Sequence, residues 1–246
     1  MKAIVMTLVL AALAFSAAGQ DYERERRWEQ EVRSFLMVGD AVRIASPRGP
    51  SFLGLHAEGA PGKPAVVLVH GMGVHPDHGI IGSLRAALSD LGFETLSIQM
   101  PVLPADASGT AYPPLFPEAA GRIAAAADWL RAKGRQRIVL LSHSMGSWMS
   151  QSYLEAAAST PFAAWICIGR SGALAAIAGH KVPVLDLYGE IDYPAVLQHA
   201  AERRRTLERI PGSQQTVIDG ADHFFAGREK ELAQTVRAFI EGLRQP

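Results

Sequence analysis

The sequence has a single cysteine, no net charge and no internal repeat among its 246 residues. Because Cys167 has no second cysteine in the chain, an intramolecular disulfide framework and a cysteine-based zinc site are both excluded. Basic and acidic residues number 24 each, so charge gives no reason to expect nucleic acid as a partner. A hydrophobic content of 48% instead suits one globular domain with a sizeable core.

Long hydrophobic runs are also lacking. Lys2 precedes an uncharged stretch from Ala3 to Phe15, which is too short to cross a bilayer comfortably, and the small residues 16–19 follow it. This pattern predicts a secretory signal peptide over residues 1–19, cleaved after Ala18 or Gly19. An uncleaved anchor fits less well, and no cysteine follows to accept lipid. We therefore expect a periplasmic or secreted mature chain without an integral membrane span.

Residues 20–40 form the next predicted unit. The stretch from Asp21 to Phe35 is highly charged, and Trp28, Val32 and Phe35 are spaced i, i+4, i+7. This spacing predicts an amphipathic helix lying on the domain surface, with membrane or partner binding as the alternative.

Residues 41–246 alternate between apolar runs and helical patterns. Predicted strands cover 41–45, 52–57, 65–69, 95–98, 137–141, 163–168, 183–188 and 216–218, and the first two read as an antiparallel hairpin at the sheet edge. Predicted helices cover 80–91, 118–133, 147–158, 194–207 and a final amphipathic segment, with a long loop from Met100 to Pro117. The pattern predicts an α/β fold, with a mostly parallel sheet, helices on both faces and no large cap domain.

The stretch from Arg137 to Gly146 carries the first candidate functional residue. A short apolar strand leads to Ser142-His-Ser-Met-Gly146, and a helical segment follows. This is the context of a nucleophile elbow, in which Ser144 sits on a tight turn and its neighbours two residues away must be small. The usual pattern has glycine where this chain has Ser142. Taken alone, the stretch fits a helix N-cap at Ser144 equally well.

Candidate partners for Ser144 follow the last two predicted strands. A serine nucleophile needs an adjacent base that is held by a third group, and the order Ser144, Asp192, His223 supplies both. Asp192 also fits the start of a helix, and His223 also fits an ordinary surface histidine. Glu190, Asp219 and Asp222 are rival acids.

Two backbone N–H groups are predicted to form an oxyanion hole, those of Met145 after the nucleophile and Met72 after His70-Gly71. We expect His75 and His78 at the mouth of the pocket, and Tyr112 and Phe116 on one apolar wall of it. His75, Asp77 and His78 also suggest a metal, but one short cluster without further ligands is weak support. Gly71 and Gly73 fail the dinucleotide-binding spacing because position 76 is proline. No cofactor is predicted.

Four motifs in this order, LVHGMG, LSHSMG, YGEID and GADHFF, resemble the landmarks of the α/β-hydrolase superfamily from about Ala41 onward. More narrowly, HGMGVHPD, TLSIQMP and YPPLFP resemble a bacterial family of exported hydrolase-like proteins of unassigned substrate. The resemblance implies the fold and a Ser144–Asp192–His223 triad, and it implies nothing about substrate.

The sequence therefore predicts an exported serine hydrolase. The first expectation is a carboxylesterase for short to medium acyl esters, either small molecules or envelope-derived, working through an acyl-enzyme. An acyltransferase or thioesterase would use the same residues. A catalytically silent binding protein of the cell envelope is the alternative from another class. The sequence does not indicate an oligomeric state.

Overall fold

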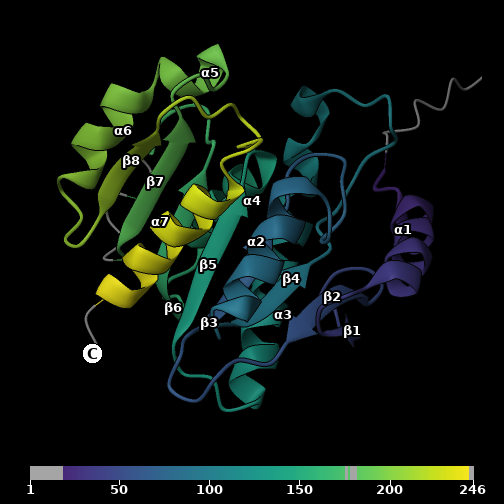
Figure 1. The fold of residues 1–246 in the computed structure, drawn as a ribbon. Helices are drawn as coiled ribbons and strands as arrows, with labels where there is room; N and C mark the ends of the chain where they lie inside the picture. The colour runs from purple at the N-terminus through teal and green to yellow at the C-terminus, as the bar shows by residue number, and fades with distance from the viewer. Residues whose placement is uncertain (1–18, 175–176, 178–181, 244–246) are drawn as a thin grey trace, which may run out of the picture.

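Within residues 19–174, 177 and 182–243, which the computed structural model of the protein describes, eight strands form one sheet (Figure 1). The strand order is β1-β2-β4-β3-β5-β6-β7-β8. Strand β2 pairs antiparallel with both of its neighbours, and every other pairing is parallel. The strands are β1 (Asp40–Ile44), β2 (Phe52–Ala57), β3 (Ala65–Val69), β4 (Glu94–Ile98), β5 (Ile138–His143), β6 (Phe162–Ile168), β7 (Val184–Gly189) and β8 (Gln214–Ile218).

Helices cover both faces of the sheet, which confirms the predicted fold class. Helices α2 and α7 pack on one face, where α7 is drawn in yellow in Figure 1, and α3 and α4 pack on the other. The helices are α1 (Tyr22–Phe35), α2 (Gly79–Asp90), α3 (Phe116–Ala132), α4 (Met145–Ala156), α5 (Pro194–Leu197), α6 (Ala200–Leu207) and α7 (Glu229–Gly242). Short 3-10 turns η1 (Gly109–Ala111) and η2 (Pro113–Leu115) precede α3.

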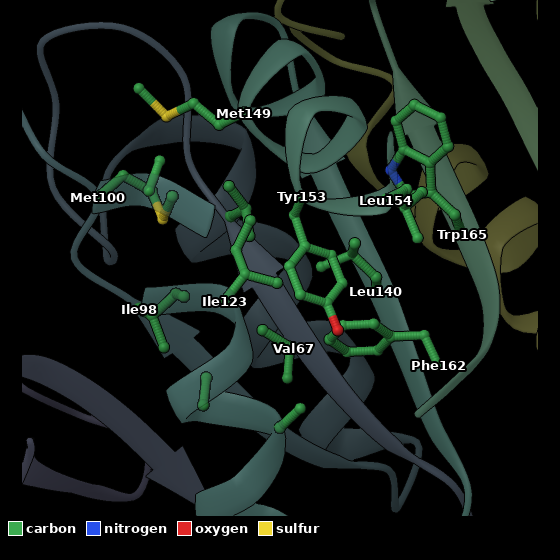
Figure 2. Close-up of a cluster of buried hydrophobic side chains, with 14 of the residues drawn as sticks. Val67, Ile98, Met100, Ile123, Leu140, Met149, Tyr153, Leu154, Phe162 and Trp165 are labelled. Atoms are coloured by element: carbon green, nitrogen blue, oxygen red, sulfur yellow. The ribbon is translucent and has the colours of Figure 1, made fainter. Parts of the chain in front are cut away.

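Alternate residues of the central strands supply the two halves of the core. Val67 and Leu140 face the α3–α4 side, where Ile123 and Tyr153 meet them (Figure 2). The intervening residues of the same strands face α2 and α7. Because residues from both faces of β3 and β5 are buried, these strands read as continuous apolar runs in the sequence.

The segment before α3 differs from the predicted loop. Tyr112 and Leu115 are buried in the α3–α4 half of the core, and Phe116 packs against it as the first residue of α3. The Tyr112 hydroxyl also accepts a weak hydrogen bond from Leu103 N–H at 3.4 Å. Aromatic residues in a proline-rich stretch therefore serve packing here, because the segment folds back over the sheet.

Helix α1 forms where the charged amphipathic pattern predicted it. Asp21 caps it by accepting a hydrogen bond from Arg24 N–H at 2.8 Å. Val32 is buried against β2, but Phe35 is 76% exposed, so the predicted apolar stripe covers only part of the helix. The buried face instead includes Glu25, whose partner is described below.

Two further expectations concern the N-terminal segment and the link between β6 and β7. The predicted signal peptide falls on residues 1–18, which lie outside the described part of the chain. In the part that is described, no helix combines the length and the apolar composition needed to cross a membrane. Strand β6 ends at Ile168 and β7 begins at Val184, so the link between them is too short for a cap domain.

Candidate active site

Ser144 lies at the sharp turn between β5 and α4, at the carboxyl edge of the sheet. Its backbone has φ 55° and ψ −122°, a conformation that non-glycine residues rarely adopt and that costs free energy. Gly146 is required on the following turn, because a Cβ there would lie 2.4 Å from His70 O. The turn therefore presents a partly exposed Ser144 side chain at the start of a helix, as the elbow pattern predicts.

Ser142 replaces the first glycine of the elbow pattern without leaving a polar group unpaired. The side chain is fully buried, and its Oγ accepts a hydrogen bond from Trp165 Nε1–H at 2.8 Å. The hydroxyl also donates to Ser147 Oγ at 3.2 Å. Hydrogen bonding of this kind removes the cost of burying the hydroxyl, so the departure from glycine is accommodated.

His223 and Asp192 meet Ser144 in one line of hydrogen bonds. His223 Nε2 lies 3.0 Å from Ser144 Oγ, and His223 Nδ1 lies 2.6 Å from Asp192 Oδ1. A carboxylate can only accept, so Nδ1 carries the proton and Nε2 accepts the hydrogen bond from the serine hydroxyl. The loops after β5, β7 and β8 supply the three residues, because parallel strands bring their carboxyl ends to one edge.

Two of the three rival acids, Glu190 and Asp222, make other contacts. Glu190 Oε2 accepts a hydrogen bond from Gly220 N–H at 2.8 Å on the exposed surface. Asp222 Oδ1 accepts from Phe224 N–H at 2.9 Å and from Ala226 N–H at 3.2 Å, within its own loop. Asp192 is buried and contacts the imidazole, so it is the carboxylate that the structure places beside His223.

Two rings that the sequence analysis did not single out pack on His223. Tyr193 stacks on the imidazole with ring centroids 4.3 Å apart and an interplanar angle of 27°. His143 lies at 4.8 Å, and its Nε2–H donates to the backbone carbonyl of His223 at 3.0 Å. Burial lowers the pKa of His143 to about 4, so this ring is neutral near pH 7. Adjacency to Ser144 and Asp192 was the available sequence signal for both rings.

The Met72 peptide is held by the buried side chain of His70. His70 Nδ1–H donates to Gly71 O at 2.8 Å, and His70 Nε2 accepts from Met100 N–H at 2.9 Å. Burial lowers the pKa of His70 to about 3, which is consistent with a neutral ring that donates at one nitrogen and accepts at the other. In a trans peptide the Met72 N–H points opposite to the Gly71 carbonyl, and therefore away from His70.

The second predicted donor is the N–H of Met145. Met145 is the first residue of α4, so its N–H has no acceptor within the helix. The positive end of the helix dipole adds to the attraction for an anion at this position. Gly71 lies close to Ser144, since a Cβ on Gly71 would sit 3.4 Å from Ser144 Cβ. The 70–78 loop and the start of α4 thus flank the serine together.

A cavity of about 470 Å³ opens beside Ser144 and His223. Its apolar lining comes mainly from the 70–78 loop, α2 and the loop after β8, through Met72, Val74, Ile80, Ile81 and Phe224. His78, Ser83 and Glu229 are polar, exposed residues of the same lining. Most of the cavity therefore suits an apolar group, with polar side chains at the solvent side.

Of the residues predicted to line the pocket, His78 lies in the lining of this cavity, whereas His75, Tyr112 and Phe116 do not. The expectation for Tyr112 and Phe116 was wrong, because both pack into the core on the α3 side of the sheet. His75 instead packs between Trp28 of α1 and His78, with ring centroids at 5.8 and 5.4 Å. His78, its neighbour in that cluster, is the histidine that reaches the cavity.

Within the part of the chain that the structure describes, no three His, Cys, Asp or Glu side chains come together as a metal site. Asp77 accepts from Arg85 Nη2–H at 2.6 Å, so it is engaged in an ion pair and not with His75 and His78 as a ligand set. Cys167 is buried, and burial raises the pKa of its thiol to about 12, so it is not a thiolate nucleophile near neutral pH.

Neither a protein-family model nor a curated protein matches the sequence. Solved structures do match. A dienelactone hydrolase from Anabaena variabilis aligns with TM-score 0.66 at 21% identity, over 84% of this chain and 98% of that one. A thermophilic esterase from Thermogutta terrifontis aligns with TM-score 0.63 at 15% identity, over 84% of this chain and all of that one. An α/β serine hydrolase without a lid from Xanthomonas campestris aligns with TM-score 0.62 at 17% identity, over 86% and 99%. The chain therefore has the α/β-hydrolase fold.

Proposed function

We propose that this protein is a serine hydrolase, and specifically a carboxylesterase. The observation that carries the proposal is the line of contacts from Ser144 Oγ to His223 Nε2 at 3.0 Å and from His223 Nδ1 to Asp192 Oδ1 at 2.6 Å. The same serine sits in a strained turn beside an apolar cavity. Strain at a reactive residue is a common feature of functional sites, because the surrounding structure must hold it.

In the proposed reaction, His223 Nε2 takes the proton of Ser144 as Oγ bonds to the ester carbonyl carbon. The resulting tetrahedral intermediate collapses, the carbon–oxygen bond to the alcohol breaks, and His223 returns the proton to the leaving alcohol. Water then attacks the acyl-enzyme by the same route and releases the acid. Asp192 keeps the proton on Nδ1 and stabilises the imidazolium that forms in each step.

The backbone N–H groups of Met72 and Met145 serve as the oxyanion site in this mechanism. Both lie beside Ser144, on the 70–78 loop and at the start of α4. Removing a single oxyanion donor in a serine hydrolase typically costs about 10²–10³ in kcat, so these two peptides would supply a large share of the rate.

The cavity favours apolar ester groups of short to medium size as substrates. Its lining by Val74, Ile80 and Ile81 replaces the wall that the sequence analysis assigned to Tyr112 and Phe116. A volume of about 470 Å³ and a short β6–β7 link leave room for such a group without a closing lid. A series of p-nitrophenyl esters of rising chain length tests this, and a clear optimum at long chains with activation above the solubility limit would contradict it.

An esterase, a thioesterase and an acyltransferase would all use these residues. The similarity in fold to an esterase and to a dienelactone hydrolase supports hydrolysis of carboxylic esters, although fold by itself does not fix the reaction. A parallel panel of oxygen esters, thioesters and acceptor alcohols distinguishes the three, because only a transferase forms a new ester in preference to free acid.

Labelling with a fluorophosphonate tests the core of the proposal. Wild-type protein should be labelled at Ser144, and Ser144→Ala should lose both labelling and ester hydrolysis with nearly unchanged thermal stability. The matched control is Ser83→Ala. Ser83 lines the same cavity but has no histidine within hydrogen-bond distance among the described residues, so this variant should still be labelled.

The same experiment separates the proposal from a catalytically silent binding protein. A wild-type protein that folds, yet is neither labelled nor active on any ester or thioester, would favour a binding role. Labelling that persists in Ser144→Ala would show that another residue is the nucleophile.

Export of the protein remains a proposal that rests on the sequence of residues 1–19, which lie almost wholly outside the described part. Signal cleavage would place the mature N-terminus next to Gln20, immediately before the cap and first turn of α1. Mass spectrometry of protein from the envelope and culture fractions should find this end. A chain that still begins at Met1 in those fractions would contradict the proposal.

A further inference from the structure

Helix α1 reaches the active-site loop directly through Arg24. Its Nη2–H donates to Gly73 O at 3.0 Å, and its Nη1–H donates to Leu103 O at 2.8 Å. The guanidinium also lies over the Trp28 ring, 4.4 Å from the centroid, which restricts its conformation. One planar side chain thus ties α1 to the 70–78 loop and to the segment that follows β4.

Side chains hold the backbone carbonyls of the residues on both sides of Met72. His70 binds the carbonyl of Gly71, and Arg24 binds the carbonyl of Gly73. Glycines flank Met72 on both sides, and Gly73 has φ +67°, so the backbone here has more freedom than most loops. A peptide with that freedom needs external contacts if its N–H is to keep one direction.

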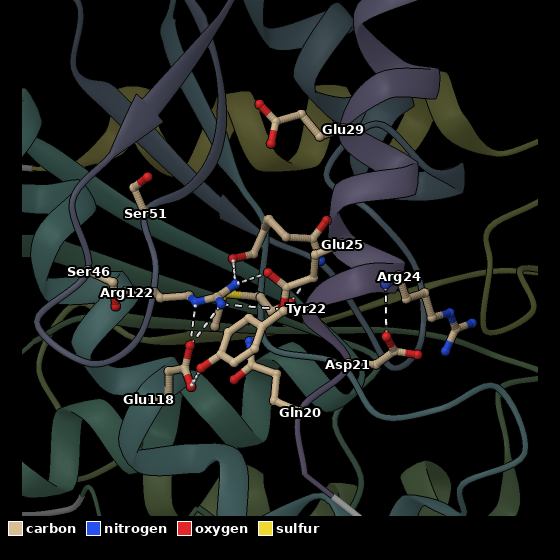
Figure 3. Close-up of polar contacts among 12 residues, drawn as sticks. Gln20, Asp21, Tyr22, Arg24, Glu25, Glu29, Ser46, Ser51, Glu118 and Arg122 are labelled. Carbon is tan, nitrogen blue, oxygen red and sulfur yellow. Dashed lines mark hydrogen bonds and ion pairs between the residues drawn. The ribbon is translucent and has the colours of Figure 1, made fainter.

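A buried ion pair fixes the other side of α1 to the domain. Arg122 of α3 bonds to Glu25 of α1 at 2.9 Å and to Glu118 at 2.8 Å, as Figure 3 shows. The same guanidinium donates to Gln99 O at 2.9 Å, and Gln99 adjoins Met100, whose N–H bonds to His70. Helix α1 is therefore anchored to the network that holds the Gly71 carbonyl as well as to Gly73 itself.

We propose that Arg24 is a positioning residue for the oxyanion site, holding the 70–78 loop so that the Met72 N–H faces Ser144. The proposal rests on the serine-hydrolase function proposed above. Under this proposal α1, which lies outside the β-α alternation of the domain, contributes to catalysis by positioning the active-site loop.

Loss of this contact should affect the transition state more than the bound substrate. An ester carbonyl in the ground state is only weakly polarised, whereas the tetrahedral oxyanion depends on a well-directed donor. Arg24→Ala should therefore lower kcat about 10-fold and weaken binding of a trifluoromethyl ketone, which forms a tetrahedral adduct, by a similar factor. KM should change by less than about twofold, because the contacts that bind the substrate in its ground state remain.

The experiment compares Arg24→Ala and Arg24→Lys with Arg27→Ala, a control at an exposed arginine of the same helix. Lysine keeps the charge but lacks the planar fork that spans two carbonyls, so Arg24→Lys should fall between wild type and Arg24→Ala. Added guanidinium ion should restore part of kcat in Arg24→Ala only. Hydrogen exchange of the peptide covering residues 70–78 should quicken in Arg24→Ala and stay unchanged in Arg27→Ala.

Each outcome decides the proposal. Unchanged kcat, inhibitor affinity and exchange in a folded Arg24→Ala variant would overturn it. So would a loss of kcat that disappears on cooling and tracks thermal stability, because that would be unfolding. If the wild-type protein proves unreactive to fluorophosphonate, the proposed function fails, while the exchange measurement still reports whether Arg24 holds the loop.

Discussion

On one side of Ser144, His223 and Asp192 are joined by side-chain hydrogen bonds within loops at the carboxyl edge of the sheet. On the other side, the 70–78 loop offers backbone N–H groups, and its carbonyls are held by His70 and Arg24. The side of Ser144 that carries His223 and Asp192, the base side, thus depends on the identity of these two side chains. The side that carries the 70–78 loop, the oxyanion side, depends on the direction of backbone N–H groups. A second layer of side chains, Arg24 and Glu25 of α1 and Arg122 of α3, holds this backbone in place. We therefore expect substitutions on the base side to abolish activity. Substitutions in the second layer should reduce activity only in part, as at Arg24, or lower stability, as at the buried ion pair.

The largest effect tests the base side. Asp192→Asn should lower kcat/KM about 10⁴-fold, because the amide can donate to Nδ1 and so favours the tautomer with the proton on Nε2. Ester hydrolysis and the rate of fluorophosphonate labelling both measure this. Glu190→Gln is the control, since its retained oxygen can still accept from Gly220 N–H. If Glu190→Gln loses the activity and Asp192→Asn keeps it, the acid is assigned wrongly.

The second-largest expected effect concerns the buried ion pair between Glu25 and Arg122, which belongs to the second layer of the oxyanion side. Glu25→Ala should lower the free energy of unfolding by about 3 kcal/mol, because Arg122 is fully buried and, among the described residues, would keep only Glu118 as an ionic partner. Urea denaturation measures the change. Glu31→Ala, at an exposed position of the same helix, should stay within about 0.5 kcal/mol of wild type. Equal stabilities of the two variants would show that α1 is not anchored through Glu25.

A third effect concerns His143, which lies between the two sides. Its Nε2–H bonds to His223 O, and a Cβ on Gly71 would meet its Nδ1 at 3.5 Å. Burial lowers the folded-state pKa to about 4, whereas an unfolded histidine titrates near 6.5. The folded-state pKa is depressed, so the stabilisation is complete above the unfolded value and is lost as pH falls from about 6.5 toward 4.

His143→Gln removes this titration and keeps an N–H donor for the His223 carbonyl. Wild type should lose about 2 kcal/mol more unfolding free energy than His143→Gln between pH 7 and pH 5, since one pKa unit corresponds to about 1.4 kcal/mol. Denaturation curves at the two pH values measure the difference. Identical pH dependences would mean that His143 is charged in the folded protein or does not titrate in this range.

The same contrast explains what the sequence could predict. Strand and helix positions followed from apolar runs and glycine stops, and β3 was placed at Ala65–Val69, as the structure has it. Ser144, Asp192 and His223 were found because each sits in a short motif at the end of a strand, where chain order restricts the partners. Their spatial meeting in the structure agrees with that prediction, and their catalytic roles stay predictions.

Contacts between distant segments could not be predicted in this way. The Arg24–Gly73 and Glu25–Arg122 contacts join residues 49 and 97 positions apart, and a charged residue on an amphipathic helix gives no sign of its partner. The same limit misplaced Tyr112 and Phe116, since an aromatic residue in a loop fits a core and a pocket wall equally well. Of the two histidines predicted at the mouth of the pocket, His78 lies in the cavity lining and His75 does not, because the sequence carries no signal for side-chain direction within this loop.

The smallest effect tests how far the base side extends beyond its two polar residues. Tyr193 is 52% exposed, yet its ring stacks on His223 at 4.3 Å and lines the cavity. An aromatic face stabilises the imidazolium that forms during catalysis, by about 0.5–1 kcal/mol at an exposed site. Tyr193→Ala should therefore lower kcat/KM about 2- to 5-fold, by that same amount of free energy. Tyr193→Phe should retain wild-type activity, because the ring and not the hydroxyl makes the contact. Phe224 forms a T-shaped pair with His223 at a longer centroid distance of 5.2 Å, so Phe224→Leu should cost less than Tyr193→Ala. An alanine variant at Tyr193 with full kcat/KM would confine the base side to His223 and Asp192.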